Sequence, residues 1–120
     1  MGTPLGNLKA KKNGIQMELT ALDILPKLEL TNDKIDAILD DKLIEIKSCQ
    51  KYVIDVSRKT TQTRFGRFRL NKDQHEYLVK NNGYYFFILN ESGNAGRWKL
   101  VKASEIEFKH VIDWRRIFND

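Results

Sequence analysis

What the chain lacks narrows its class before any motif is considered. It has a single cysteine, Cys49, so a disulfide framework is excluded and a reducing, cytoplasmic setting is expected, with the thiol acting as a small buried hydrophobe. No apolar run approaches the roughly 20 residues that span a bilayer, and the N-terminus lacks the apolar core of a signal peptide. His110 has no second His or Cys at ligand spacing, which argues against a zinc site.

Positive charge exceeds negative charge, and the excess is unevenly placed. The 21 Lys and Arg against 16 Asp and Glu give a net charge of +5 in 120 residues. Basic residues gather at positions 9–12 and, more densely, at 58–69, which suits contact with a polyanion around an acidic centre. The length predicts one compact domain, residues 14–120, after a flexible arm at residues 1–13 that lacks periodicity.

Residues 34–48 alternate in polarity at the period of a β-strand, on both sides of an acidic pair at 40–41. The pattern predicts an antiparallel hairpin that turns at this pair. In the register closed there, Asp36 lies directly opposite Glu45, and the period of two places Lys47 on the same face. One hairpin therefore brings two carboxylates and an ammonium group together.

Two acids placed opposite each other need a compensating charge. Opposed Cβ atoms lie about 4.5–5.5 Å apart, where like charges repel. The neighbours of Asp36 and Glu45 on that face are Ile38 and Leu43, so unpaired carboxylates would also be costly to bury. A divalent cation removes both costs, and two carboxylates with a backbone carbonyl and waters suit Mg²⁺. The alternative is a surface hairpin whose charges face water.

The same residues resemble the signature of the PD-(D/E)XK nuclease superfamily, an Asp on one strand followed by Glu-x-Lys on the next. In this chain the signature is Asp36 with Glu45-Ile46-Lys47. The resemblance implies an α/β, restriction-endonuclease-like core, with a mixed central sheet flanked by helices in the order α-β-β-β-α-β. It also implies a DNA endonuclease dependent on Mg²⁺, for which Mn²⁺ substitutes, with the metal held by Asp36, Glu45 and the carbonyl of Ile46. Lys47 would orient or deprotonate the attacking water.

Two helices are predicted to accompany this hairpin. Apolar spacing predicts the first at residues 14–25, and Glu18 lies on its apolar stripe. The resemblance implies that Glu18 faces the metal site, and an edge position in contact with water is the alternative. A capping box and a following Asn-Gly predict the second helix at residues 72–81. There Gln74 either points toward the carboxylates or serves only as the capping-box residue, and His75 is expected to be exposed to solvent.

The remaining periodicity completes the predicted core. Residues 27–30 predict a strand that joins the hairpin in a three-stranded meander, and the apolar run 84–89 predicts a central buried strand. Residues 97–102 alternate and predict an outer strand, and a capping box at 104–107 predicts the last helix. Residues 52–56 are apolar and β-branched but lead into the basic stretch, so they predict either a further strand of the sheet or a flap.

The basic stretch after the hairpin carries the predicted nucleic-acid contacts. Interleaved aromatic residues, and Gly66, which lets a backbone approach closely, favour phosphate binding over a merely solvated face. The residues predicted to bind nucleic acid are Arg58, Lys59, Arg64, Arg67 and Arg69. Their charge would supply salt-dependent affinity.

Within the superfamily the chain is most similar to the small archaeal Holliday junction resolvases. The similarity lies in Lys-Asn-Gly at residues 12–14 followed by Glu18, and in the compact step from Asp36 to Glu45. It implies a structure-specific enzyme that acts as a homodimer. The short interval between Glu18 and Asp36 and the Arg-rich insertion depart from that pattern. A sequence-specific restriction or homing endonuclease and a non-catalytic nucleic-acid-binding module are the alternatives.

Overall fold

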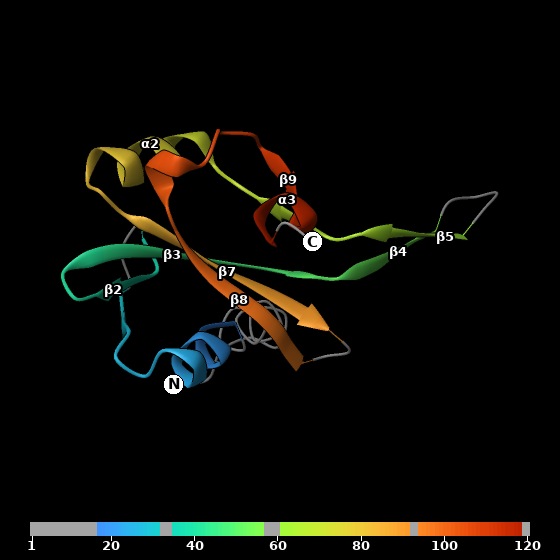
Figure 1. Cartoon of the computed structure of the whole chain (residues 1–120), viewed down its shortest axis with the longest axis horizontal. Coiled ribbons are helices and arrows are strands. Elements are labelled where there is room, and N and C mark those ends of the chain that lie inside the picture. The colour runs from blue at the N-terminus through green and yellow to red at the C-terminus, as the bar shows by residue number, and fades with distance from the viewer. Residues whose placement is uncertain (1–16, 32–34, 57–60, 92–93, 119–120) are drawn as a thin grey trace, which may run out of the picture.

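A five-stranded mixed sheet forms the centre of the fold in the computed structural model (Figure 1). In spatial order its strands are β1 (Glu29–Leu30), β2 (Ala37–Leu39), β3 (Lys42–Gln50), β7 (Tyr84–Glu91) and β8 (Asn94–Lys102). Strands β3 and β7 run parallel, and the other neighbours run antiparallel. The predicted α/β fold, with a mixed central sheet flanked by helices, is confirmed.

The structure describes four stretches of the chain, residues 17–31, 35–56, 61–91 and 94–118. The arm expected at residues 1–13 lies outside them, as do Arg58 and Lys59. No helix within these stretches is long and apolar enough to cross a membrane.

The β2–β3 hairpin has the predicted register. Its Cα partners are Ala37 with Ile44, Ile38 with Leu43 and Leu39 with Lys42. Continued by one residue, this ladder places Asp36 opposite Glu45, as predicted. Asp40 and Asp41 form the turn, with positive φ angles of 48° and 65°. Positive φ at both central residues is the backbone of a type I′ turn, whose twist matches that of the strands.

Replacing Asp41 by glycine is expected to stabilise the protein. The left-handed backbone costs an L residue about 1–2 kcal/mol, and the greater freedom of unfolded glycine offsets part of the relief. We expect the free energy of unfolding to rise by about 0.5 kcal/mol in urea denaturation. Asp41→Ala removes the same charge but keeps the Cβ atom, so it should give no gain. An equal gain in both variants would mean that charge repulsion, not backbone conformation, limits the turn.

Each face of the sheet carries its own hydrophobic core. The first helix, described over residues 17–24, covers one face, and α2 (Lys72–Lys80) and α3 (Trp114–Phe118) lie on the other (Figure 1). The core under the first helix includes Ala21, Ile44, Ile46, Phe86 and Ile88. The core under α2 and α3 includes Leu78, Tyr85, Phe87, Leu89 and Trp114. Successive side chains of β3 and β7 point to opposite faces, which explains the division.

The connection between the parallel strands β3 and β7 is a long crossover, residues 51–83. It contains β4 (Tyr52–Val56), β5 (Thr61–Phe65), β6 (Arg67–Arg69) and α2. Strands β4 and β5 pair with each other as an antiparallel ribbon, separate from the main sheet. Figure 1 shows this ribbon extending away from the body of the molecule. Residues 52–56 therefore form a ribbon strand and do not widen the central sheet.

The prediction of a last helix from the capping box at 104–107 is wrong. The chain instead forms a short 3₁₀ helix, η1 (Ala103–Glu105), and β9 (Val111–Asp113), which pairs antiparallel with β6 before α3 begins. The N–H of Ala103 donates to the carbonyl of Gly83 at 2.9 Å, and the N–H of Leu70 donates to the carbonyl of His110 at 2.9 Å. These long-range hydrogen bonds outweigh the local helix signal.

The prediction that His75 is exposed is also wrong. Its side chain is buried on α2, where Nδ1 lies 2.8 Å from the hydroxyl of Tyr85 and the two rings stack. Burial lowers the pKa of His75, which favours the neutral imidazole. The hydroxyl gives a histidine ring a buried hydrogen-bond partner that the helical pattern alone does not reveal.

Candidate active site

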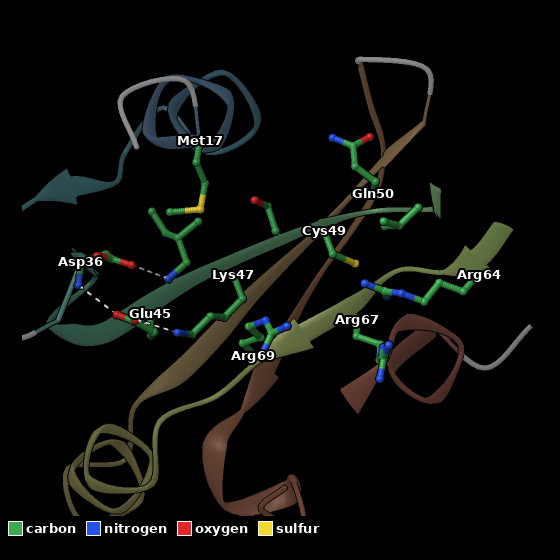
Figure 2. Close-up of a pocket in the computed structure, with 12 residues that line it drawn as sticks. Met17, Asp36, Glu45, Lys47, Cys49, Gln50, Arg64, Arg67 and Arg69 are labelled. Atoms are coloured by element: carbon green, nitrogen blue, oxygen red, sulfur yellow. Dashed lines mark hydrogen bonds and ion pairs between the residues drawn. The ribbon is translucent and has the colours of Figure 1, made fainter. Parts of the chain in front are cut away.

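Two carboxylates meet at the edge of β3, next to the point where β2 begins. Asp36 immediately precedes β2, and its backbone N–H donates to Oε1 of Glu45 at 3.3 Å. The N–H of Ile46 donates to Oδ2 of Asp36 at 3.1 Å. Both contacts are drawn in Figure 2. Because each crosses from one strand of the hairpin to the other, the register of the hairpin holds the two acids together.

Lys47 lies beside this pair. Its Nζ is 3.3 Å from Oε2 of Glu45, and its side chain remains partly exposed. We refer to Asp36, Glu45 and Lys47 as the charged cluster. The three side chains come from one hairpin, so a single local element positions all of them.

The environment of Glu45 opposes its ionisation. The residue is only 4% exposed. Burial and, next, the adjacent charge of Asp36 raise the pKa of Glu45 to about 7, although Lys47 acts in the opposite direction. The pair of acids is therefore held with insufficient positive charge around it. A cation bound between them would relieve that imbalance.

A cleft of about 550 Å³ opens beside the charged cluster. Figure 2 shows the cluster toward one end and three arginines of the crossover further along, Arg69, then Arg67, then Arg64. Arg67 and Arg69 are two residues apart on β6, so they share one side of the strand, while Phe68 between them is buried in the core. We call the three arginines the basic wall. The cleft thus combines an acidic centre with groups suited to phosphate oxygens.

The charged cluster offers the oxygen donors that a hard divalent cation prefers. Asp36 and Glu45 supply carboxylates, and the carbonyl of Ile46 belongs to the same edge of β3. Within the described residues, no group of three or more His, Cys, Asp or Glu side chains is placed to hold a metal. A cation here would therefore complete its shell with backbone oxygen and water, which fits Mg²⁺ better than zinc.

Comparison with known families decides the assignment. A family model described as a PD-(D/E)XK nuclease superfamily domain matches residues 6–117. The chain belongs to the PD-(D/E)XK nuclease superfamily. No curated protein and no solved structure matches it significantly. The superfamily signature pairs an Asp on one strand with Glu-x-Lys on the next, and Asp36, Glu45 and Lys47 occupy those positions across the β2–β3 hairpin.

Glu18, the remaining predicted ligand of this nuclease domain, is not among the described residues that line the cleft. It is half-buried in the helix of residues 17–24. Met17, from the same helix, reaches the cleft instead, as Figure 2 shows. A role for Glu18 in holding a second metal stays a prediction.

Gln74 lies at the start of α2. Its backbone N–H donates to Oδ1 of Asn71 at 3.0 Å, which confirms the predicted helix cap. The Oε1 atom of Gln74 is buried, and the residue is not part of the described cleft lining. A role for Gln74 beside the charged cluster stays a prediction.

The cleft also includes residues that the sequence reasoning missed, Ser48, Gln50 and Val53. Strand β2 has three residues and β3 has nine, so β2 covers only the first part of this edge of β3. In the sequence, the alternating run after the turn is longer than the run before it, and this difference could have indicated that part of the β3 edge stays uncovered. Cys49 lines the cleft as well, and burial followed by the charge of Asp113 raises its pKa to about 12. It packs against the core as an un-ionised thiol, consistent with the predicted packing role.

Tyr85 was also missed, and it backs the charged cluster from β7. It is the register partner of Glu45 in the parallel β3–β7 ladder and is fully buried. Burial and the charge of Glu45 raise the pKa of Tyr85, so its phenol stays protonated. The Tyr85 and His75 pair therefore adds no charge behind the acids.

Proposed function

We propose that the chain is a metal-dependent DNA endonuclease that uses Mg²⁺, with Mn²⁺ as a substitute, to hydrolyse phosphodiester bonds at the charged cluster. The observation that carries the proposal is the adjacency of Asp36 and Glu45 in a buried setting that raises the pKa of Glu45 to about 7. An acid pair of this kind lacks positive charge, and the neighbouring basic wall suits the phosphates of a nucleic acid.

Some of these residues would bind the cation, and others would contact the attacking water or the DNA. Asp36, Glu45 and the carbonyl of Ile46 would hold the metal, which when bound supplies an acidified water and neutralises charge on the scissile phosphate. Lys47, whose ammonium group is already within 3.3 Å of Glu45, orients the attacking water and stabilises negative charge as it develops. The basic wall binds flanking phosphates.

The preferred DNA shape follows from the resemblance rather than from the cleft. Similarity to the archaeal Holliday junction resolvases makes a four-way junction the first substrate to test, with a homodimer as the acting form. A restriction or homing-type enzyme would cut linear duplex at particular sequences instead. A binding module without catalysis would leave every substrate intact and would bind DNA independently of divalent metal.

The test is a cleavage assay over duplex, single-stranded, flapped and four-way DNA, with Mg²⁺, with Mn²⁺ and with EDTA. We expect cutting with either metal and none with EDTA. Asp36→Ala and Lys47→Ala should each reduce the cleavage rate by at least about 100-fold, because each removes a group that acts on the reacting atoms. Binding of DNA in EDTA should persist in both variants, because the basic wall is intact.

Asp40→Ala is the matched control, since it removes an exposed carboxylate from the turn of the same hairpin. It should leave the cleavage rate within about twofold of the parent protein, because solvent screens its charge. Full activity in Asp36→Ala, or equal losses in Asp36→Ala and Asp40→Ala, would refute the assigned roles.

A further inference from the structure

The β4–β5 ribbon leaves the body of the protein, but several contacts hold its base, which we call the root. The carbonyl of Lys51 accepts hydrogen bonds from the N–H of Gly66 at 3.0 Å and from Nε1 of Trp114 at 2.9 Å. Phe65 packs edge-on against Trp114 at 5.9 Å between ring centroids, and the guanidinium of Arg115 lies 3.7 Å from its ring centre. Two-stranded ribbons are marginally stable in water, so these contacts fix where the ribbon points.

Beyond the root, the two faces of the ribbon differ in chemistry. On one face, Val53 pairs with Arg64, and both line the cleft. The pairing two residues further along places Gln62 on that same face. The opposite face carries Tyr52, Ile54 and Thr63, all exposed. The face that continues the cleft therefore carries the polar and charged positions, Arg64 and Gln62 together with Asp55, the register partner of Gln62.

The ribbon also continues the basic wall in space. Figure 2 places Arg64 at the end of the wall farthest from Asp36 and Glu45, on β5, one of the two strands of the ribbon. Gln62 follows on β5, on the same face as Arg64, and is exposed. A phosphate backbone that leaves the charged cluster along the three arginines meets this face next. Each strand of the ribbon has five residues, about 16 Å of extended chain, and a major groove about 12 Å wide admits such a ribbon.

We propose that the β4–β5 ribbon is a docking arm for double-stranded DNA, which contacts the duplex beyond the cleft through its Gln62 and Arg64 face. The proposal rests on the proposed function, because it takes the charged cluster as the place where DNA is cut. Double-stranded DNA is favoured over a single strand because single-strand platforms stack bases on aromatic rings. The exposed aromatic ring of the ribbon, Tyr52, lies on the face away from the cleft.

The test places one negative charge on each face of the same strand. Gln62→Glu adds it on the cleft-facing side, and Thr63→Glu adds it one residue away on the opposite side, where Thr63 pairs with Ile54. Binding of a fluorescein-labelled duplex is measured by anisotropy in EDTA at low ionic strength. We expect Gln62→Glu to weaken duplex binding about fivefold, because a carboxylate then faces phosphates, and Thr63→Glu to change it less than about twofold.

A second pair of variants separates loss of contact from loss of folding. Gln62→Lys should tighten duplex binding by about the same factor while Thr63→Lys leaves it nearly unchanged, and a misfolded arm would not bind more tightly. A same-length single strand should respond less to the Gln62 variants than the duplex does.

Equal effects at both positions, or a larger effect at Thr63, would overturn the proposal. A change of sedimentation state in Thr63→Glu without any change of DNA binding in Gln62→Glu would overturn it in favour of contact between chains. Because the readout is binding in EDTA, it does not depend on cleavage. Failure of the charged cluster to cut DNA would therefore be a separate result.

Discussion

Replacing Glu45 by glutamine is expected to abolish cleavage and, without metal, to stabilise the folded protein above neutral pH. Glutamine keeps the shape of the side chain but offers no carboxylate to a cation. The cleavage rate should therefore fall by at least about 100-fold. The gain in stability arises because glutamine imitates the protonated carboxyl, which is the form that the buried site favours.

The direction of the pH dependence follows from the raised pKa of Glu45. The carboxyl has a pKa near 4.5 in the unfolded chain and about 7 in the folded protein. Between these values the folded state binds the proton more tightly, so this group makes the free energy of unfolding fall as pH rises from about 4.5 to about 7. The difference of about 2.5 pH units corresponds to about 3 kcal/mol, and the side chain is nearly fully buried.

Urea denaturation in EDTA at about pH 4 and about pH 8 measures this effect. Glu45→Gln and the parent protein should have similar stability at the lower pH and differ by up to about 3 kcal/mol at the higher. Glu76→Gln, at an exposed position on α2, is the control and should follow the parent curve. Added Mg²⁺ should stabilise the parent protein but not Glu45→Gln, because binding to the folded state alone raises stability. Parallel curves for Glu45→Gln and Glu76→Gln would contradict the raised pKa.

Gly66→Ala is expected to be the most destabilising single methyl addition among the described glycines. A Cβ atom at Gly66 would overlap the carbonyl oxygen of Gln50, which is backbone and cannot rotate away. Gly66 also donates to Lys51 and accepts a hydrogen bond from the N–H of Trp114 at 3.3 Å. Making room would separate these backbone segments, so we expect the free energy of unfolding to fall by about 3 kcal/mol or more.

The control for this prediction is Gly96→Ala on β8. There the added Cβ would meet the flexible side chain of Glu91, which is half-buried and can adjust together with its ion-pair partners Lys51 and Arg97. The loss should stay below about 1 kcal/mol. Surviving Gly66→Ala protein should also bind duplex DNA more weakly, because the same backbone contact roots the ribbon. Similar stability losses at the two glycines would show that the close approach at Gln50 is not restrictive.

Local patterns were enough to predict the elements that hold the acids. Residues 34–48 follow the period of a strand on both sides of an acidic turn, so their period and turn determine the register that brings Asp36 to Glu45. The helix from 72, the apolar strand from 84 and the ending of the first helix near Leu25 were predicted in the same way, from caps, Pro26 and hydrophobic runs. In each case the residues that carry the pattern lie within the predicted element or within a few residues of its end.

The parts that sequence reasoning missed depend on partners far along the chain. Residues 111–113 form a strand only because β6 lies beside them, and His75 is buried only because Tyr85 presents its hydroxyl. The fate of residues 52–56 was likewise decided by pairing with β5 rather than by their own apolar character. None of these partners is visible in a window of neighbouring residues.

The crossover between β3 and β7 contains the residues proposed to bind DNA, whereas the residues proposed to cut DNA come before it in the chain. Asp36, Glu45 and Lys47 all precede it, and the arginines and Gln62 all lie within residues 51–83. Within it, β6 and α2 contribute to the core, whereas β4 and β5 pair with each other outside the main sheet, so the ribbon could be exchanged for another loop without disturbing the register that assembles the acids. Relatives could thus diverge in the nucleic acid they hold while keeping one cutting centre, and grafted ribbons offer a route to retarget the enzyme.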